Sequence, residues 1–160
     1  MNKLFHSLAI GAMLAFALTS VASAADAPDP LIGTWKLNLE KSKFAAGNAP
    51  KSITRTYAAT AGGTAMTING VGPDGSALTQ SATLTYDGKD DAWTGSTVFD
   101  SVSLKKVNGT TVKAELKKDG KVVGHSTRTI TDKGKVMTIS TALKTAKGGT
   151  THETAVYDKQ

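Results

Sequence analysis

The chain has 160 residues, 19 basic and 13 acidic side chains, a formal net charge of +6 and no cysteine. The lack of cysteine excludes disulfides, thiolate metal sites, thiol nucleophiles and a thiol redox role. Nucleic-acid surfaces join basic clusters to exposed aromatic rings, but aromatics are only 6% of this chain and do not alternate with its scattered lysines. A charged surface that favours solubility is the preferred interpretation.

Residues 1–24 have the pattern of a signal peptide. Lys3 supplies the positive charge, "LAIGAMLAFAL" the apolar run, and Ala22 and Ala24 the two small residues of a cleavage site. The apolar run falls short of the roughly 20 residues that a membrane-spanning helix needs. We therefore expect cleavage after Ala24, a periplasmic or secreted protein without a membrane span in its mature form, and one domain over residues 25–160.

Turn signals divide the rest of the chain at short intervals, and no stretch shows a convincing helical period. Thr is frequent and suits strands because its β-branched side chain packs well on a pleated surface. Asn-Gly and Asp-Gly pairs between alternating segments are strong hairpin signals. Nine strands are predicted, at residues 32–38, 51–60, 64–71, 77–86, 98–107, 110–118, 121–131, 134–145 and 150–158.

Two connections between these strands are long. The first, "LEKSKFAAGNAPKS", is expected to contain a helical turn over Leu39 to Phe44 that plugs one end of the domain. The second lies in the wide interval between Gly88 and Asn108, where a loop through "DDAWTGST" is expected before the next strand begins.

Successive hairpins with no helix to cover a sheet face favour an all-β fold, an antiparallel up-and-down β-barrel. Closure of the barrel removes the exposed strand edges that would otherwise promote aggregation. A sandwich of two sheets is the alternative, because the number of strands alone does not exclude it.

The segment "GTWKLNLEKSKF" places Gly33 and Trp35 in a G-x-W motif on the first strand. Together with "YDGKD" and "VYDKQ", it resembles the lipocalins and the wider calycin group, and in particular small exported bacterial proteins described as lipocalin-like. The resemblance implies that Trp35 packs across the closed end of the barrel, that Gly33 leaves room for it, and that a small hydrophobic molecule binds inside. It also implies a basic residue over the Trp ring, for which Arg128 and Lys159 are candidates.

Four residues are candidates for contact with a ligand. Arg55 and Tyr57 share one face of their strand, so an inward face would let Arg55 bind a carboxylate with Tyr57 as a second donor. An Arg that faces solvent or pairs with an internal acid is the preferred alternative. Arg128 is in phase with Ile130, and its orientation is left open. Trp93 is expected to cap the barrel mouth, to contact the ligand there, or to pack beneath its loop.

No other chemistry emerges from the residue spacing. His125 and His152 do not form a spaced metal motif, and no G-x-S-x-G nucleophile motif is present. The cluster of Asp87, Asp90 and Asp91 does not match a calcium loop and is interpreted as a polar hairpin tip. We expect no metal, no cofactor and no enzymatic activity, and the sequence leaves the oligomeric state open.

The sequence therefore predicts an exported lipocalin-like barrel that binds a small hydrophobic or amphipathic ligand. Apolar walls would supply most of the binding free energy, and Arg55, Tyr57 or Arg128 would hold a polar head. The alternative is a protein-interaction role without catalysis, as an exported inhibitor or envelope stress factor, with the barrel interior filled. An enclosed pocket of roughly 300 Å³ or more, lined by apolar groups with a few polar ones, would favour the first role. A filled core with an exposed apolar patch would favour the second.

Overall fold

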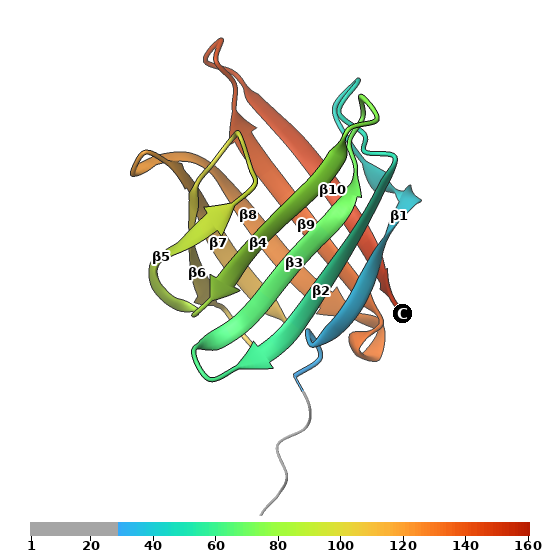
Figure 1. The fold of residues 1–160 in the computed structure, drawn as a ribbon, viewed down its shortest axis with the longest axis vertical. Helices are drawn as coiled ribbons and strands as arrows, with labels where there is room; N and C mark the ends of the chain where they lie inside the picture. The colour runs from blue at the N-terminus through green and yellow to red at the C-terminus, as the bar shows by residue number, and fades with distance from the viewer. Residues whose placement is uncertain (1–28) are drawn as a thin grey trace, which may run out of the picture.

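Ten antiparallel strands follow one another around a closed barrel in the computed structural model, which describes residues 29–160 (Figure 1). They are β1 (Gly33–Lys43), β2 (Ser52–Thr60), β3 (Gly63–Val71), β4 (Ala77–Leu84), β5 (Asp87–Thr94), β6 (Ser101–Lys106), β7 (Thr111–Lys118), β8 (Lys121–Thr131), β9 (Val136–Lys144) and β10 (Thr150–Lys159). Each strand pairs with its neighbours along the chain, and β1 pairs with β10 to close the barrel. The predicted all-β up-and-down barrel is confirmed, and the two-sheet sandwich is excluded.

Within residues 29–160 the single helical element is the short 3-10 turn η1 (Asp132–Gly134) between β8 and β9. This part of the chain holds no helix of the length and hydropathy that crossing a membrane requires. The predicted signal peptide at residues 1–24 lies outside the described residues.

Strand β5 corrects the prediction of a long loop through "DDAWTGST". It pairs with β4 at only two positions, Ser81 and Ala82, but along its length with β6. The buried Asp91 carboxylate accepts hydrogen bonds from the backbone N–H and the hydroxyl of Thr85, both at 2.9 Å. Tertiary contacts therefore make a strand from a segment of low strand propensity. The predicted polar hairpin tip is also wrong, because its three Asp residues lie along this strand.

The predicted helical turn over Leu39 to Phe44 is wrong as well, because β1 continues to Lys43. Its register against β10 shifts between Asn38 and Lys43, which marks a bulge. Within the bulge the Ser42 hydroxyl donates to the Asn38 carbonyl at 2.6 Å, and the Lys41 N–H donates to Asn38 Oδ1 at 3.1 Å. These local bonds bend the strand without starting a helix.

Trp35 closes the end of the barrel at which the described chain begins. It has no exposed surface, and its indole N–H donates to the Leu31 carbonyl at 2.8 Å. Lys159, rather than Arg128, is the basic residue over the ring, with Nζ 5.1 Å from the ring centroid and a 2.7 Å bond to the Pro30 carbonyl.

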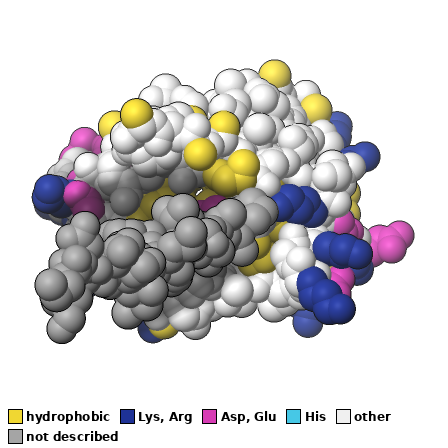
Figure 2. Space-filling model, turned by 90° about the horizontal axis from the view of Figure 1, so that it is seen from below, with side chains coloured by type: hydrophobic (Ala, Val, Ile, Leu, Met, Phe, Trp, Pro, Cys, Tyr) yellow, Lys and Arg dark blue, Asp and Glu magenta, His cyan; other side chains and the backbone are white. Residues whose placement is uncertain are grey.

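Gly33 has a different role from the one expected. Its φ is 128°, and a Cβ at this position would lie 3.1 Å from Cε of Lys159. Gly33 therefore leaves room for Lys159, which in turn covers Trp35. Figure 2 views this end of the barrel, with hydrophobic side chains near its centre and basic side chains at its periphery.

Candidate functional site

The barrel encloses a partly open cavity of about 220 Å³. All four residues predicted to contact a ligand line it, namely Arg55, Tyr57, Trp93 and Arg128. Its volume lies below the roughly 300 Å³ at which the usual range for ligand pockets begins, so it suits a small ligand. Most of its wall is apolar, formed by Met66, Leu84, Val102, Leu104, Val112, Leu116, Ile139 and Leu143.

Arg55 enters the barrel from β2, next to Trp35 on β1. Its Nε donates to the Tyr157 hydroxyl at 3.1 Å, and its Nη1 donates to the Tyr57 hydroxyl at 3.5 Å. The guanidinium also lies 5.2 Å from the centroid of the Tyr157 ring, within the range of a cation–π contact. The preferred prediction for Arg55, a solvent-facing side chain or one paired with an internal acid, is wrong.

Arg128 enters from β8, between Val112 on β7 and Ile139 on β9. Its Nη2 donates to the Tyr86 hydroxyl at 3.1 Å, and its guanidinium lies 5.5 Å and 5.6 Å from the rings of Tyr86 and Tyr57. The open question of its orientation is therefore answered, because it faces inward. Strand β8 also shifts its register against β7, because Leu116 pairs with Gly124 but Lys117 pairs with Val122. The shift interrupts the alternation of inward and outward side chains along β8 near Val122.

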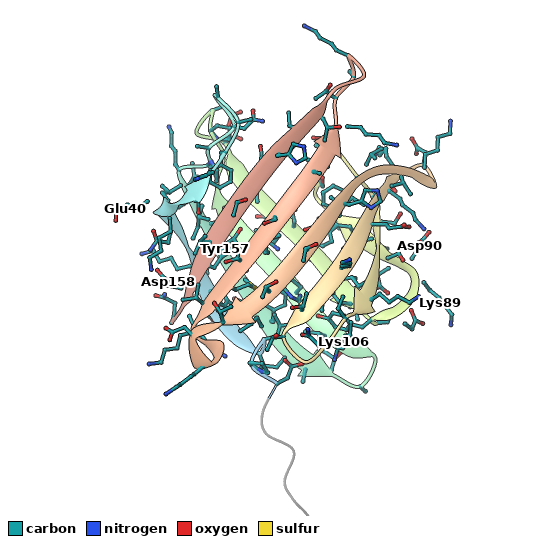
Figure 3. The ribbon with its side chains drawn as sticks, turned by 180° about the vertical axis from the view of Figure 1, so that it is seen from behind. Glu40, Lys89, Asp90, Lys106, Tyr157 and Asp158 are labelled. Atoms are coloured by element: carbon teal, nitrogen blue, oxygen red, sulfur yellow. The ribbon has the colours of Figure 1, made fainter. Side chains whose placement is uncertain are left out.

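The chain contains two Arg and three Tyr, and all five lie in this one group. We call Arg55, Arg128, Tyr57, Tyr86 and Tyr157 the Arg–Tyr cluster. Figure 3 labels Tyr157 on β10, and Lys106 near the lower end of the barrel, where its Nζ lies 5.0 Å from the centroid of the Tyr86 ring. The cluster lies just above the floor that Trp35 forms.

Sequence reasoning missed Tyr86 and Tyr157. Tyr86 follows β4 with a φ of 60°, a left-handed conformation that strand alternation does not anticipate. Tyr157 lies on the last strand beside Val156, which is also buried, so alternation does not single it out. Its partner Arg55 lies 102 residues earlier in the chain.

Neither guanidinium of the cluster forms an ion pair within residues 29–160, where every salt bridge involves Lys. The Tyr hydroxyls accept from Nε and Nη1 of Arg55 and from Nη2 of Arg128. The other guanidinium nitrogens, Nη2 of Arg55 and both Nε and Nη1 of Arg128, have no protein acceptor within residues 29–160. No fully buried side-chain nitrogen or oxygen in the described chain lacks a hydrogen-bond partner. Each of these three nitrogens therefore keeps some exposed surface, and both Arg side chains line the cavity, where such nitrogens can donate to an anion.

Burial alone would lower the pKa of Arg55, but the phenolic oxygens of Tyr157 and Tyr57 outweigh it and raise that pKa above its usual value. Burial raises the pKa of Tyr86 above its usual value, although Arg128 opposes the shift. Arg55 therefore stays charged and Tyr86 stays neutral at ordinary pH. The Arg–Tyr cluster therefore carries positive charge beside the neutral Tyr86 hydroxyl.

Trp93 lies on the wall of the cavity, beneath the loop of residues 95–100 that joins β5 and β6. Its ring centroid is 5.1 Å from that of Phe99 at an interplanar angle of 58°, and its indole N–H donates to Gln80 Oε1 at 3.0 Å. Trp93 therefore packs against its loop and also faces the cavity. Contact with a ligand stays a prediction.

A second polar group on the cavity wall was not foreseen. Ser126, Thr141 and Glu153 lie side by side on β8, β9 and β10, and all three line the cavity. The hydroxyl oxygens of Ser126 and Thr141 are 3.2 Å apart, and Glu153 accepts a bond of 3.2 Å from the Asn48 side chain in the β1–β2 connection. The neighbouring residues His125 and His152 each lie beside Ala142 on these strands.

No protein-family model matches the chain, and no curated protein sequence matches it. Among solved structures, the chain is similar to zebrafish ileal bile acid-binding protein, whose crystal structure contains cholic acid. The two share 12% sequence identity over 82% of this chain and 99% of that one, with a TM-score of 0.52. The likeness shows the fold alone, a closed antiparallel β-barrel.

Proposed function

We propose that this protein is a lipocalin-like carrier that binds a small amphipathic molecule with an anionic head inside the barrel, without catalysing a reaction. The head would lie against the three free guanidinium nitrogens of the Arg–Tyr cluster. The apolar tail would lie along the wall toward the mouth, where each buried methylene contributes about 0.8 kcal/mol.

One observation carries this proposal: Arg and Lys side chains occupy different places in the barrel. Both Arg of the chain lie inside the barrel and have no acidic partner within residues 29–160, where the ion pairs all use Lys. A guanidinium presents several fixed N–H donors that match a carboxylate, and it is less strongly hydrated than an ammonium group. Two partly buried cations that form no ion pair within residues 29–160 are costly, so a bound anion would stabilise the site.

The fold agrees with this proposal, since the zebrafish protein of similar fold holds cholic acid in its crystal structure. The protein-interaction alternative has less support. The large exposed hydrophobic residues of the described chain are Leu39, Val98 and Val107, which lie on β1, in the β5–β6 loop and beside the β6–β7 turn. Single apolar residues on separate elements do not form a docking patch.

Export is a further part of the proposal, supported by the signal-peptide pattern of residues 1–24. Intact-mass measurement of the protein recovered from its native cells would test it. We expect a mature chain that begins at Ala25 in the extracytoplasmic fraction. A full-length chain in the cytoplasm would contradict export and leave the ligand-binding proposal to its own test.

The ligand-binding proposal is tested by native mass spectrometry of the protein isolated from its own cells, followed by titration with short fatty acids read by Trp fluorescence. Trp93 lines the cavity and should report binding, so Trp93→Phe should remove most of the signal. We expect Arg55→Gln and Arg128→Gln each to weaken carboxylate binding about tenfold or more, because each removes charge-assisted hydrogen bonds.

Lys147→Gln provides the matched control, because it removes one positive charge from an exposed position outside the barrel. It should bind as the wild type does, and thermal melting checks that each variant is folded. The proposal fails if no small molecule copurifies and no fatty acid changes the emission. It also fails if the Arg variants bind carboxylates as tightly as the Lys147 variant does.

A further inference from the structure

We propose that the ligand has two polar ends: an anionic group held by the Arg–Tyr cluster, and a hydrogen-bond donor, cationic or hydroxyl, held by Glu153 nearer the mouth. This inference rests on the proposed function and specifies the chemical class of the ligand. It follows from where the cavity places its charges, which are positive near the floor and negative toward the other end.

Strand register places the two ends of the site. Glu153 and Tyr157 both face the interior from β10, four residues apart, which corresponds to about 13 Å along a strand. On β8 and β9 the row of Ser126 and Thr141 lies one inward position above that of Arg128 and Ile139. Polar groups therefore occupy one level of the wall, above the level of the cationic cluster.

Glu153 is not neutralised by the protein in the described chain. It forms no salt bridge there, and its one side-chain partner is the neutral amide of Asn48, which donates to Oε1. Asp91 shows the contrast, because Thr85 donates to both of its oxygens. Oε2 of Glu153 therefore has no protein donor within residues 29–160, although it belongs to a residue that lines the cavity.

A ligand with a purely apolar tail fits this arrangement poorly. Its tail would displace water from the Glu153 carboxylate without replacing the lost hydrogen bonds, which is unfavourable for a charged group. An amine or hydroxyl at the end of the tail would donate to Oε2 and restore them. Opposite charges at the two ends of the cavity also select the direction in which such a ligand enters.

Calorimetric titration of the wild-type protein with straight-chain carboxylates of six to twelve carbons tests this inference. At each length three probes are compared, with a methyl, an ω-hydroxyl or an ω-amino terminus. We expect the ω-amino probe to bind about tenfold more tightly than the methyl probe, and the ω-hydroxyl probe to lie between them. The preference should be greatest at one chain length, because the two polar ends of the site are a fixed distance apart.

Glu153→Gln keeps an acceptor but removes the charge, so it should abolish the preference for the ω-amino probe and keep a preference for the ω-hydroxyl probe. Glu40→Gln is the matched control, because Glu40 is exposed on the outside of β1 (Figure 3) and its removal should leave every ratio unchanged. Affinity of the Glu153 variant for the methyl probe at or above the wild-type value would show that it is folded, because the variant no longer has a charged group for the tail to desolvate. If that variant does not fold, the probe ratios of the wild-type protein decide alone.

The outcomes separate this inference from the proposed function. Tight binding of the methyl probes with no gain from either donor group would overturn the inference and leave the proposed function standing. An ω-amino preference that survives in Glu153→Gln would also overturn it, since another group would then hold the amine. If no probe of any kind binds to the wild-type protein, both the inference and the proposed function are wrong.

Discussion

Lys159 shows how one side chain connects the two ends of the chain. Its ammonium group covers the Trp35 ring and donates to the Pro30 carbonyl, so the last strand holds both the first strand and the segment before it. Trp35 in turn donates to Leu31, which is buried. The floor of the barrel is thus a chain of contacts from Pro30 to Lys159.

Lys159→Met tests this arrangement, since Met keeps much of the apolar stem but removes the charge. We expect the free energy of unfolding to fall by about 1 to 3 kcal/mol, through loss of the cation–π contact and of one charge-assisted hydrogen bond. Urea denaturation measures it. Lys147→Met, at an exposed position, should change stability by less than about 0.5 kcal/mol. Equal stability of the two variants would show that the floor does not depend on Lys159.

At the same scale, sequence reasoning found the parts of the site that strand alternation reveals. Arg55 and Tyr57 are two residues apart on one strand, so their common face could be predicted, although the direction of that face could not. The partners of Arg55 and Arg128 come from distant strands, and their identity depends on barrel register. Glu153 was missed because "HET" contains no motif that distinguishes an inward acid from a surface acid.

At the scale of elements, the strands that the sequence predicted well are those with regular alternation and Asn-Gly or Asp-Gly turns, such as β7 and β8. β5 was missed because Asp, Gly and Lys dominate its first half, and its structure depends on Asp91 binding back to Thr85. The end of β1 was misassigned because a bulge and a helical turn both form bonds between residues three or four apart.

Close approach between β2 and β3 depends on Gly70. A Cβ at this position would meet the carbonyl oxygen of Ser52 and lie 3.0 Å from Cα of Ile53, both of them backbone atoms that cannot turn away. We expect Gly70→Ala to lower the free energy of unfolding by about 1 to 3 kcal/mol. Chemical denaturation measures the change.

Gly109→Ala is the control for this prediction, because a Cβ there would have no heavy atom within 4 Å and the residue is not in the left-handed region. Its stability should match the wild type within about 0.5 kcal/mol. If Gly70→Ala is as stable as Gly109→Ala, strands β2 and β3 are farther apart than described here.

The stability contributed by the contact between β1 and β10, which closes the barrel, should depend on pH in the acid range. The Asn38 side chain donates to Asp158 at 2.6 Å, Lys41 lies 3.3 Å away, and together they lower the pKa of the Asp158 carboxyl. Because its folded-state pKa lies below the unfolded value of about 3.9, its stabilising effect is fully present above that value. The effect is lost as pH falls through the folded-state pKa.

Asp158→Asn should therefore lower stability at neutral pH and converge with the wild type in strong acid. Thermal melting across this pH range measures the difference. Asp119→Asn is the control, since Asp119 is exposed and its carboxylate makes no hydrogen bond or ion pair in the described chain. If the melting temperatures of the Asp158 variant and the wild type differ by the same amount at every pH, the account is contradicted.

At the scale of the whole molecule, ring closure and one sealed end define where a ligand can lie. The strands form a continuous ladder with β1 against β10 (Figure 1). Trp35 is fully buried at the floor. The Arg–Tyr cluster lies above the floor, and the loop after β5 packs on Trp93. A ligand head at the cluster would thus lie away from the mouth, where partial burial strengthens its interaction with the guanidinium groups.

The central claim is that two guanidinium groups hold an anionic head inside the barrel, and carbon NMR of a carboxyl-labelled short fatty acid tests it most directly. A carboxylate beside Arg55 and Arg128 should keep its charge in the complex, so the pKa of the bound carboxyl should lie well below that of the free acid. In Arg55→Gln and Arg128→Gln that depression should shrink. A bound carboxyl that titrates as the free acid does, or one unaffected by both substitutions, would contradict the account.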